Sequence, residues 1–143
     1  MELTATESNL IINLHRIVTD LDRKTKVLCQ KQGLTFGQFM VLEALYHKGP
    51  LSVGEVKESI LSTDGTIPVI VANMEKAGLL ARKQDEKDRR KSILSLTKKG
   101  RDIIREVYPD NAEMIHTAFS VWNDRKKGDL KRLLAAYWDQ KTF

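Results

Sequence analysis

Hydrophobic residues recur along this chain at intervals of three and four positions, a spacing that places them on one face of an α-helix. The first helix is predicted from about residue 8 to about residue 31, with a stripe formed by Leu10, Ile11, Leu14, Ile17, Val18, Leu21, Thr25 and Leu28. The same spacing predicts helices over 35–48, 52–60, 66–77 and 97–119, and a last helix from about residue 124 that buries Leu130, Leu133, Leu134 and Tyr137. Pro109 is expected to bend or interrupt the helix over 97–119, because proline lacks an amide donor and its ring clashes with the preceding turn.

Residues with known capping preferences mark the helix ends. Thr35 and Gln38, and again Ser52 and Glu55, have the spacing of a capping box, in which two side chains satisfy each other's free backbone amides. Gly78 follows the last apolar position of its helix, where glycine adopts the left-handed conformation that ends many helices. Only about three residues separate the second predicted helix from the third.

Two short apolar segments, 79–83 and 92–96, flank a run of almost wholly charged residues at 84–91. This arrangement predicts a β-hairpin with a long basic tip. The hairpin follows a series of helices joined by tight turns, and a helix-turn-helix of this kind can place its second helix in the major groove of DNA. We therefore expect a mainly α fold with a small β-hairpin wing, that is, a winged helix-turn-helix.

The chain has 143 residues, which is the size of one domain and enough to bury a core without disulfides or a metal. Its single cysteine excludes an intramolecular disulfide and fits a reducing compartment. No apolar run approaches the ~20 residues of a membrane span, and the first residues do not have the pattern of a signal peptide. We therefore expect a cytoplasmic protein with no membrane partner.

The charge of the chain is concentrated in one segment. The 24 Lys and Arg residues exceed the 19 Asp and Glu residues by five. Residues 80–101, called the basic segment below, include nine basic and three acidic residues, so this segment carries +6 and the rest of the chain carries −1. A charge run is more often a solvated surface than a binding site. Its place on the expected wing, where a winged helix meets phosphates, favours nucleic-acid binding here.

Several sequence blocks resemble the MarR family of bacterial transcriptional regulators. They are LTFGQFMVL at 34–42, GPLSVGE at 49–55, MEKAGLLAR at 74–82, DEKDRR at 85–90 and LTKKG at 96–100. The wing signature of the family, D-x-R-D-x-R, is matched except that Lys87 replaces its first arginine. The resemblance covers nearly the whole chain and implies one domain, with a winged-helix DNA-binding region over about 34–100 and dimerisation helices over about 7–32 and 101–143. It also implies a homodimer that binds pseudo-palindromic operator DNA.

DNA contacts are predicted on the recognition helix and on the wing. The outward positions of the recognition helix are Thr63, Thr66, Pro68, Val69, Ala72 and Asn73, and the wing positions are Lys83, Lys87, Asp88, Arg89, Arg90 and Lys91. The family often has an arginine where this chain has Val69 or Asn73. Guanine is most often read by Arg or Lys, whereas Thr, Val and Ala pack on thymine methyl groups and Asn pairs with adenine. We therefore expect an A·T-rich operator, with Arg90, steadied by Asp88, in a minor groove.

The remaining candidate sites carry weaker signals. Cys29 lies beside Lys26 and Lys31, and cations can activate a thiol for redox sensing, but we favour a half-buried thiol without a role. A pocket for a small aromatic or phenolic effector, as the family commonly has, could be lined by Phe36, Phe39, Met40 and Tyr46, although core packing is the simpler role for most of them. The three histidines lie on different elements and no phosphate loop or nucleophile motif is present, so we expect no metal site, no cofactor and no enzymatic activity.

Two functions remain open from the sequence alone. The first is a homodimeric transcriptional regulator, most simply a repressor that a small molecule or an oxidant releases from DNA. The second is a winged-helix protein–protein interaction module without specific DNA binding. The recognition helix has no net charge, which favours the interaction module, whereas the +6 charge of the basic segment favours the regulator.

Overall fold

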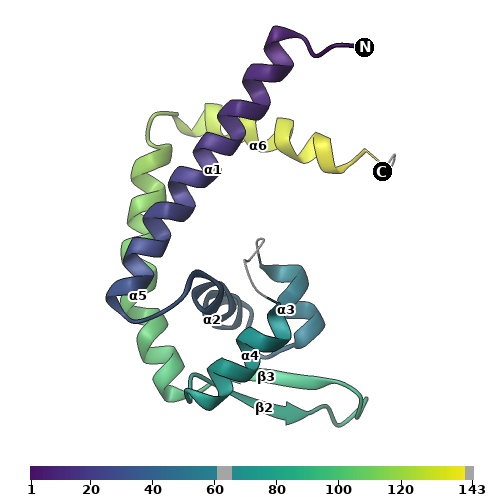
Figure 1. The fold of residues 1–143 in the computed structure, drawn as a ribbon, viewed down its shortest axis with the longest axis vertical. Helices are drawn as coiled ribbons and strands as arrows, with labels where there is room; N and C mark the ends of the chain where they lie inside the picture. Colours follow the sequence, from purple (N-terminus) through teal and green to yellow (C-terminus); the bar gives the residue numbers. More distant parts are fainter. Residues whose placement is uncertain (61–65, 141–143) are drawn as a thin grey trace. The chain divides into compact units, whose positions relative to one another are not determined.

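The computed structural model describes residues 1–60 and 66–140, and most of these residues are helical (Figure 1). In chain order the elements are α1 (Ala5–Lys31), α2 (Phe36–Lys48), β1 (Leu51–Ser52), α3 (Val53–Ser59), α4 (Ile67–Lys76), β2 (Leu80–Gln84), β3 (Ser92–Leu96), α5 (Lys98–Phe119) and α6 (Asp124–Trp138). The chain divides into two units, Met1–Asn111 and Ala112–Phe143, and α5 runs through the boundary between them. The predicted mainly α fold with a small β wing is confirmed.

The helix starts follow from local hydrogen bonds. Both predicted capping boxes are present: the hydroxyl of Thr35 accepts from the amide of Gln38 at 3.1 Å, and that of Ser52 accepts from the amide of Glu55 at 3.1 Å. A third capping box joins Thr4 and Glu7, whose side chains and amides bond reciprocally at 2.8 and 3.1 Å. This box starts α1 three residues before the predicted position, because it precedes the first apolar residues of the stripe.

The sheet has the strand order β1-β3-β2, and both pairings are antiparallel. The predicted hairpin is confirmed: Leu80 pairs with Leu96 and the register continues to Gln84 opposite Ser92. Strand β1 was not predicted. It has two residues, too few to show the alternation that identifies a strand, and it forms only because Leu51 lies opposite Leu94 on β3.

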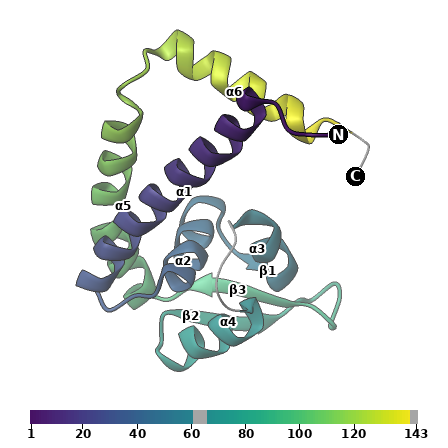
Figure 2. The same cartoon turned by 45° about the horizontal axis from the view of Figure 1, so that its top comes forward.

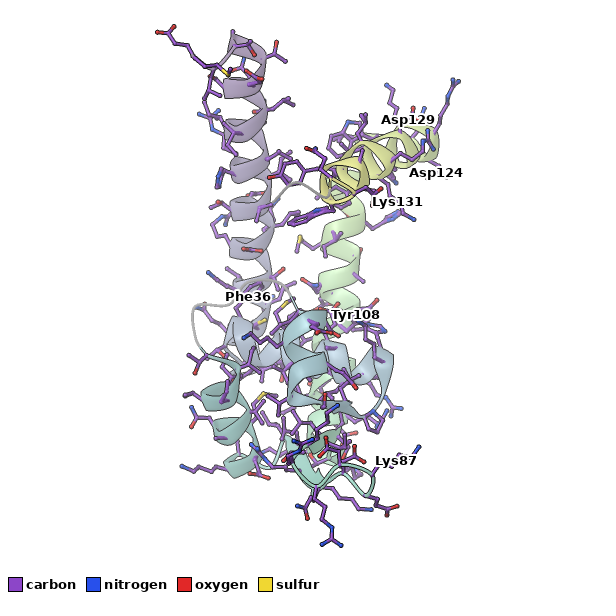
Figure 3. All side chains as sticks on the ribbon, turned by 90° about the vertical axis from the view of Figure 1, so that its right-hand side faces the viewer. Phe36, Lys87, Tyr108, Asp124, Asp129 and Lys131 are labelled. Atoms are coloured by element: carbon purple, nitrogen blue, oxygen red, sulfur yellow. The ribbon has the colours of Figure 1, made fainter. Side chains whose placement is uncertain are left out.

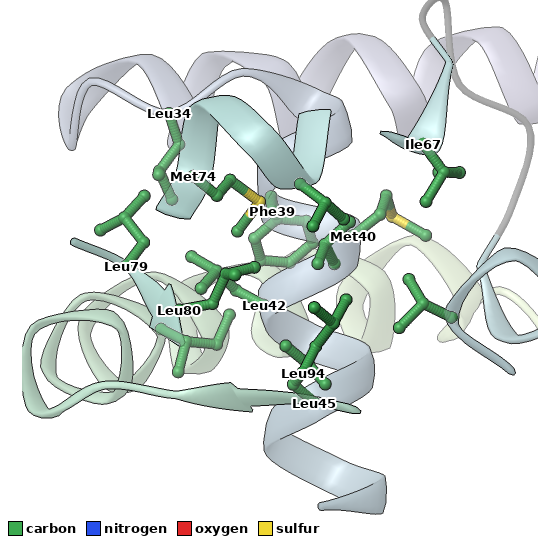
Figure 4. Packing of buried hydrophobic residues seen from close by; sticks show 14 of the residues in the cluster. Leu34, Phe39, Met40, Leu42, Leu45, Ile67, Met74, Leu79, Leu80 and Leu94 are labelled. Atoms are coloured by element: carbon green, nitrogen blue, oxygen red, sulfur yellow. The ribbon is translucent and has the colours of Figure 1, made fainter. Parts of the chain in front are cut away.

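The hydrophobic core lies around α2, which supplies six of its buried apolar side chains (Figure 4). Elements α3, α4, α5 and the sheet surround that helix with the fully buried side chains of Val56, Val71, Met74, Leu80, Leu94 and Ile104. Complete burial of one such side chain stabilises the fold by about 1.5–3 kcal/mol, so this cluster holds α2, α3, α4 and the sheet together. Beside it, the hydroxyl of Thr25 on α1 donates to the amide oxygen of Asn111 on α5 at 2.8 Å, in a buried polar pair.

Two expectations for the last helices are corrected. Helix α5 continues across Pro109, so the interruption given as one of the two expected effects of this proline is absent. Pro109 and Arg105 are both exposed, so water can hydrate the carbonyl that the missing amide leaves unbonded. Helix α6 begins at the predicted residue, but none of its four predicted core residues is buried. Leu130 is half-buried, and Leu133, Leu134 and Tyr137 are exposed, because no described part of this chain covers them.

Apolar side chains are also exposed along the first two-thirds of α1. Leu10, Ile11, Leu14, Ile17 and Val18 are between 40% and 57% exposed, and only Thr25 and Cys29 of this helix are buried. Among the described residues, no helix has the length and apolar character needed to cross a bilayer. The exposed stripe is therefore a helix face that the described part of the chain leaves uncovered.

Candidate nucleic-acid interface

Helix α4 corresponds to the predicted recognition helix, and it has an inward apolar face and an outward exposed face. Ile67, Val71 and Met74 are buried in the core, at helical spacing. The predicted outward residues Thr66, Pro68, Val69 and Asn73 are exposed and Ala72 is half-buried, whereas Thr63 lies outside the described residues. Thr66 is the N-cap and Pro68 lies in the first turn, where a missing amide costs no helical hydrogen bond.

The outward face of α4 carries the methyl groups of Val69 and Ala72, the pyrrolidine ring of Pro68 and the side-chain amide of Asn73. Val69 is 58% exposed, which is a large exposure for an aliphatic side chain within a folded domain. Such a surface can pack against thymine methyl groups, and the amide of Asn73 can accept and donate to the edge of an adenine. Within the described part of α4, Lys76 in the last turn is the only cation.

The wing consists of β2, β3 and the tip at 85–91, and Figures 1 and 2 show it extending past α3 and α4. The tip is folded by its own backbone: the amide of Asp85 donates to the carbonyl of Lys91, and the amide of Lys91 donates to the carbonyl of Asp88, both at 2.9 Å. The side-chain amide of Gln84 donates to the carbonyl of Arg89 at 2.7 Å. The tip therefore has a fixed shape before any partner binds.

The two aspartates of the tip act on neighbouring residues of the tip itself. Asp85 accepts from the amide of Lys87 at 3.1 Å. Asp88 accepts from both the amide and the guanidinium of Arg90, at 3.1 and 3.2 Å. The guanidinium, and then the backbone amide, hold the pKa of Asp88 below its ordinary value, so this carboxylate is charged at neutral pH. The predicted support of Arg90 by Asp88 is thus present in the folded chain.

The cations of the tip project into solvent. The Arg90 side chain is 92% exposed despite its bond to Asp88. Lys87 lies at the end of the wing and points outward (Figure 3). In the described residues no carboxylate is within ion-pair distance of Lys87, Arg89 or Lys91, and Lys83 reaches Glu86 only at 3.9 Å between two exposed side chains. Exposed pairs of this kind contribute little, so these charges are available for phosphates.

Three other cations of the basic segment have partners within the protein. Arg82 on β2 lies 3.8 Å from Glu75 on α4, and Lys98 lies 2.9 Å from Asp102 on α5. Lys99 donates to the carbonyl of Ala77 at 2.9 Å. The basic segment therefore has two parts: the wing tip with its exposed cations, and the start of α5, where Lys99 bonds to the protein backbone. The ion pairs of Arg82 and Lys98 are partly or largely exposed, so these charges remain accessible.

An open cleft of about 610 Å³ joins the wing to the helix-turn-helix. The sheet and wing supply its basic wall, and α3 supplies an acidic wall opposite; the lining residues are Ser52, Val53, Gly54, Glu55, Glu58, Pro68, Arg82, Arg90, Lys91 and Ser92. The wing cations and the first turn of α4 thus border one continuous surface. A polyanion can therefore contact the wing and α4 at the same time. Contact with the wing alone would bind the polyanion but would not bring its bases to α4.

The predicted effector residues do not form one exposed pocket. Phe39 and Met40 are core residues, while Phe36 and Tyr46 are half-buried at the edge of the core. The Lys26 ammonium lies 5.5 Å from the centroid of the Phe36 ring.

Sequence reasoning missed Tyr108 as an aromatic partner of both Tyr46 and His47. The ring of Tyr108 on α5 lies 6.1 Å from Tyr46 and 4.6 Å from His47 between centroids, and Figure 3 labels Tyr108. The adjacency of Tyr46 and His47 was visible in the sequence, but the approach of α5 was not.

Cys29 is completely buried, which corrects the expectation of a half-buried thiol. Burial raises its pKa to about 11, and the nearby Glu43 acts in the same direction. A thiol of this kind is rarely a thiolate at neutral pH, and the thiolate is the reactive form. Among the described residues, no group of three or more His, Cys, Asp or Glu side chains is placed to hold a metal.

Comparison with known proteins gives one consistent result. The sequence model of the MarR family matches residues 32–91. The chain is 32% identical over 124 residues to the HTH-type transcriptional regulator MhqR of Bacillus subtilis (strain 168), which covers 87% of this chain and 86% of that relative.

Solved structures share the fold over nearly the whole chain. Sco3205, a MarR family transcriptional regulator from Streptomyces coelicolor in complex with DNA, has a TM-score of 0.86 at 20% identity and covers 100% of this chain and 92% of its own. Bordetella bronchiseptica BpsR, whose DNA binding is regulated by 6-hydroxynicotinic acid, has a TM-score of 0.78 at 24% identity and covers 99% of this chain and 100% of its own.

Proposed function

Because this chain belongs to the MarR family of winged-helix transcriptional regulators, we propose that it is a homodimeric repressor of a pseudo-palindromic operator in the cytoplasm. Members of the family are DNA-binding regulators and not enzymes. Family membership therefore favours the regulator over the alternative of a protein–protein interaction module without specific DNA binding. The observation that carries the proposal is the wing tip, where internal hydrogen bonds fix the backbone and leave Lys87, Arg89, Arg90 and Lys91 exposed beside α4.

The homodimer rests on apolar surface that each unit leaves uncovered. In the first unit it is the exposed stripe of α1, and in the second it is the α6 surface that includes Leu133, Leu134 and Tyr137. Trp138 is 82% exposed and packs edge-on against Tyr137, with ring centroids 5.4 Å apart. Contiguous apolar surface of this kind on a folded chain indicates a protein interface, and a twofold axis lets the same surface serve both copies.

The operator follows from the residues that face outward. Two copies of α4 enter successive major grooves, so the half-sites lie about 10 base pairs apart, centre to centre. Val69 and Asn73 read thymine methyl groups and adenine, which gives an A·T-rich inverted repeat. The wing places Arg90 in the flanking minor groove, whose negative potential is strongest where A·T pairs narrow it.

The release signal is a small aromatic molecule. The relative BpsR is regulated by 6-hydroxynicotinic acid, and the half-buried rings of Phe36 and Tyr46, near opposite ends of α2, are the two predicted effector residues that lie at the edge of the core. An oxidant acting through Cys29 fits the structure less well, because the thiol is buried and its pKa is raised.

Selection of bound duplexes from a random library tests the proposal. We predict an A·T-rich inverted repeat, bound by two copies of the chain, in which Asn73→Ala weakens the preference for one adenine per half-site by about 1–3 kcal/mol. The matched control is Asn9→Ala, which removes an exposed amide near the start of α1, outside the predicted DNA-binding elements. A G·C-dominated motif, or a motif read equally well by the Asn73→Ala variant, would contradict the proposal.

A further inference from the structure

Three consecutive carbonyls at the exit of α4 are held by one short segment, the junction turn of residues 97–100. The carbonyl of Ala77, which is the C-cap of α4, accepts from the ammonium of Lys99 at 2.9 Å. The carbonyl of Gly78 accepts from the hydroxyl of Thr97 at 2.5 Å, and the carbonyl of Leu79 accepts from the amide of Thr97 at 3.3 Å. The end of the recognition helix is thus bonded to the start of α5.

The junction turn is itself rigid. The hydroxyl of Thr97 accepts from the amide of Gly100 at 3.1 Å, and its carbonyl accepts from the amide of Arg101 at 2.9 Å, so the same residue starts α5 and holds the exit of α4. Gly100 is buried with its Cα against the carbonyl of Leu79, in a space that a side chain cannot enter. The exit of α4 therefore has a fixed position on α5.

Within this turn, Lys99 is the residue that bonds to α4 itself. Its ammonium lies at the C-terminal end, where the partial negative charge of the helix is greatest, so charge and hydrogen bond act together. A helix of ten residues is about 15 Å long, and a tilt of about 5° about one end therefore moves the other end by about 1.3 Å. That displacement is larger than the width, about 0.5 Å, of the range of 2.7–3.2 Å over which a hydrogen bond to a base edge keeps its strength.

We propose that Lys99 is a positioning residue for operator recognition: it fixes the tilt of α4 and thereby the distance from Val69 and Asn73 to the bases. The inference rests on the proposed operator binding. It assigns the cation of Lys99 to the carbonyl of Ala77, although its place in the basic segment would suggest a phosphate contact. The two roles differ in their consequences, because a phosphate contact strengthens binding to every sequence, whereas a positioning contact strengthens binding only to the sequence that α4 reads.

The test compares Lys99→Met with Lys91→Met, a matched loss of one lysine from the wing tip. Dissociation constants are measured by fluorescence anisotropy for the selected operator and for a scrambled duplex of equal length, over a range of salt concentrations. For Lys99→Met we expect about a fivefold loss of affinity for the operator, the equivalent of one hydrogen bond, with scrambled-duplex affinity and salt slope unchanged. Lys91→Met should lower the affinity for both duplexes by the same factor and reduce the salt slope by about 1, because one phosphate fewer is neutralised.

Lys99→Arg keeps a donor for the carbonyl of Ala77 and should recover operator affinity. Equal losses on both duplexes with a smaller salt slope would show that Lys99 binds phosphate, and unchanged operator affinity would show that it has no role; either result overturns the inference. Failure of the wild-type protein to prefer any operator over the scrambled duplex would instead overturn the proposed function, and the inference with it.

Discussion

Replacing Gly100 by alanine tests the packing that joins the recognition helix to α5. A Cβ at this position would lie 1.9 Å from the carbonyl oxygen of Leu79, 3.0 Å from its carbonyl carbon and 3.4 Å from a methyl group of Leu42. Ordinary contacts begin near 3.4 Å, so the backbone at Leu79 would have to move by about 1.5 Å. The obstacle is backbone and not the flexible end of a side chain, so it cannot rotate away.

Two effects of this substitution oppose each other. Alanine is a better helix former than glycine by about 1 kcal/mol. Forcing an extra carbon into a packed core costs about 1–3 kcal/mol, and an approach as short as this one belongs at the upper end of that range. The clash therefore wins, and we expect Gly100→Ala to lower the free energy of unfolding by about 2 kcal/mol.

Urea unfolding measures this loss at a fixed protomer concentration, since the stability of the proposed dimer would depend on concentration. Gly54→Ala is the matched control, because the nearest atom to its new Cβ is the Ser52 hydroxyl at 3.9 Å. That variant should be as stable as the wild type or up to about 1 kcal/mol more stable. If Gly100→Ala were also neutral or stabilising, the close approach of α5 to the exit of α4 would be refuted.

Three further perturbations probe other parts of the chain. Burial raises the pKa of Glu43 above its ordinary value of 4.5, against the opposing effect of His47, so the wild type loses stability as the pH rises through this raised pKa. The thermal midpoint of Glu43→Gln should therefore exceed that of the wild type at pH 7 and equal it near pH 4. A wild-type midpoint that rises relative to that of the variant as the pH increases would contradict a raised pKa of Glu43. Cys29→Ser should lower the unfolding free energy by about 1 kcal/mol or more and leave operator affinity unchanged in reducing medium, and a peroxide response abolished in this variant would identify a sensor. Removing residues 124–143 should convert the dimer into monomeric or insoluble protein in sedimentation experiments, whereas a soluble truncated dimer that binds the operator would contradict the role given to α6.

Much of the fold could be predicted because it depends on local signals. The capping boxes at Thr35 and Ser52 and the apolar spacing of α4 involve residues within one or two turns of each other. The wing was predictable for the same reason, since the hairpin pairs segments close in sequence. Strand β1 was missed because its two residues become a strand only through Leu94, which is distant in sequence.

The candidate interface was predictable as a set of exposed residues but not as a set of bonds. Outward positions of α4 follow from the buried ones by helical geometry, and Thr66, Val69 and Asn73 are exposed as expected. Charge counting could not separate the exposed cations of the wing tip from Lys99, because the partner of Lys99, the carbonyl of Ala77, is set by how α5 begins against α4. The exposed apolar face of α6 likewise cannot be told from a buried one by periodicity alone.

Operator binding by Arg90→Ala tests the central claim most directly, namely that this wing and α4 together bind DNA. The side chain is 92% exposed and bonds only to Asp88 on the described wing, so its removal should leave the fold intact. The absence of one charged hydrogen bond, worth about 1.5 kcal/mol or more, should raise the dissociation constant for the selected operator by at least about tenfold. Arg105→Ala, which removes an exposed arginine of α5 away from the wing, should bind as the wild type does. Equal affinities for the wild type and both variants would contradict the account.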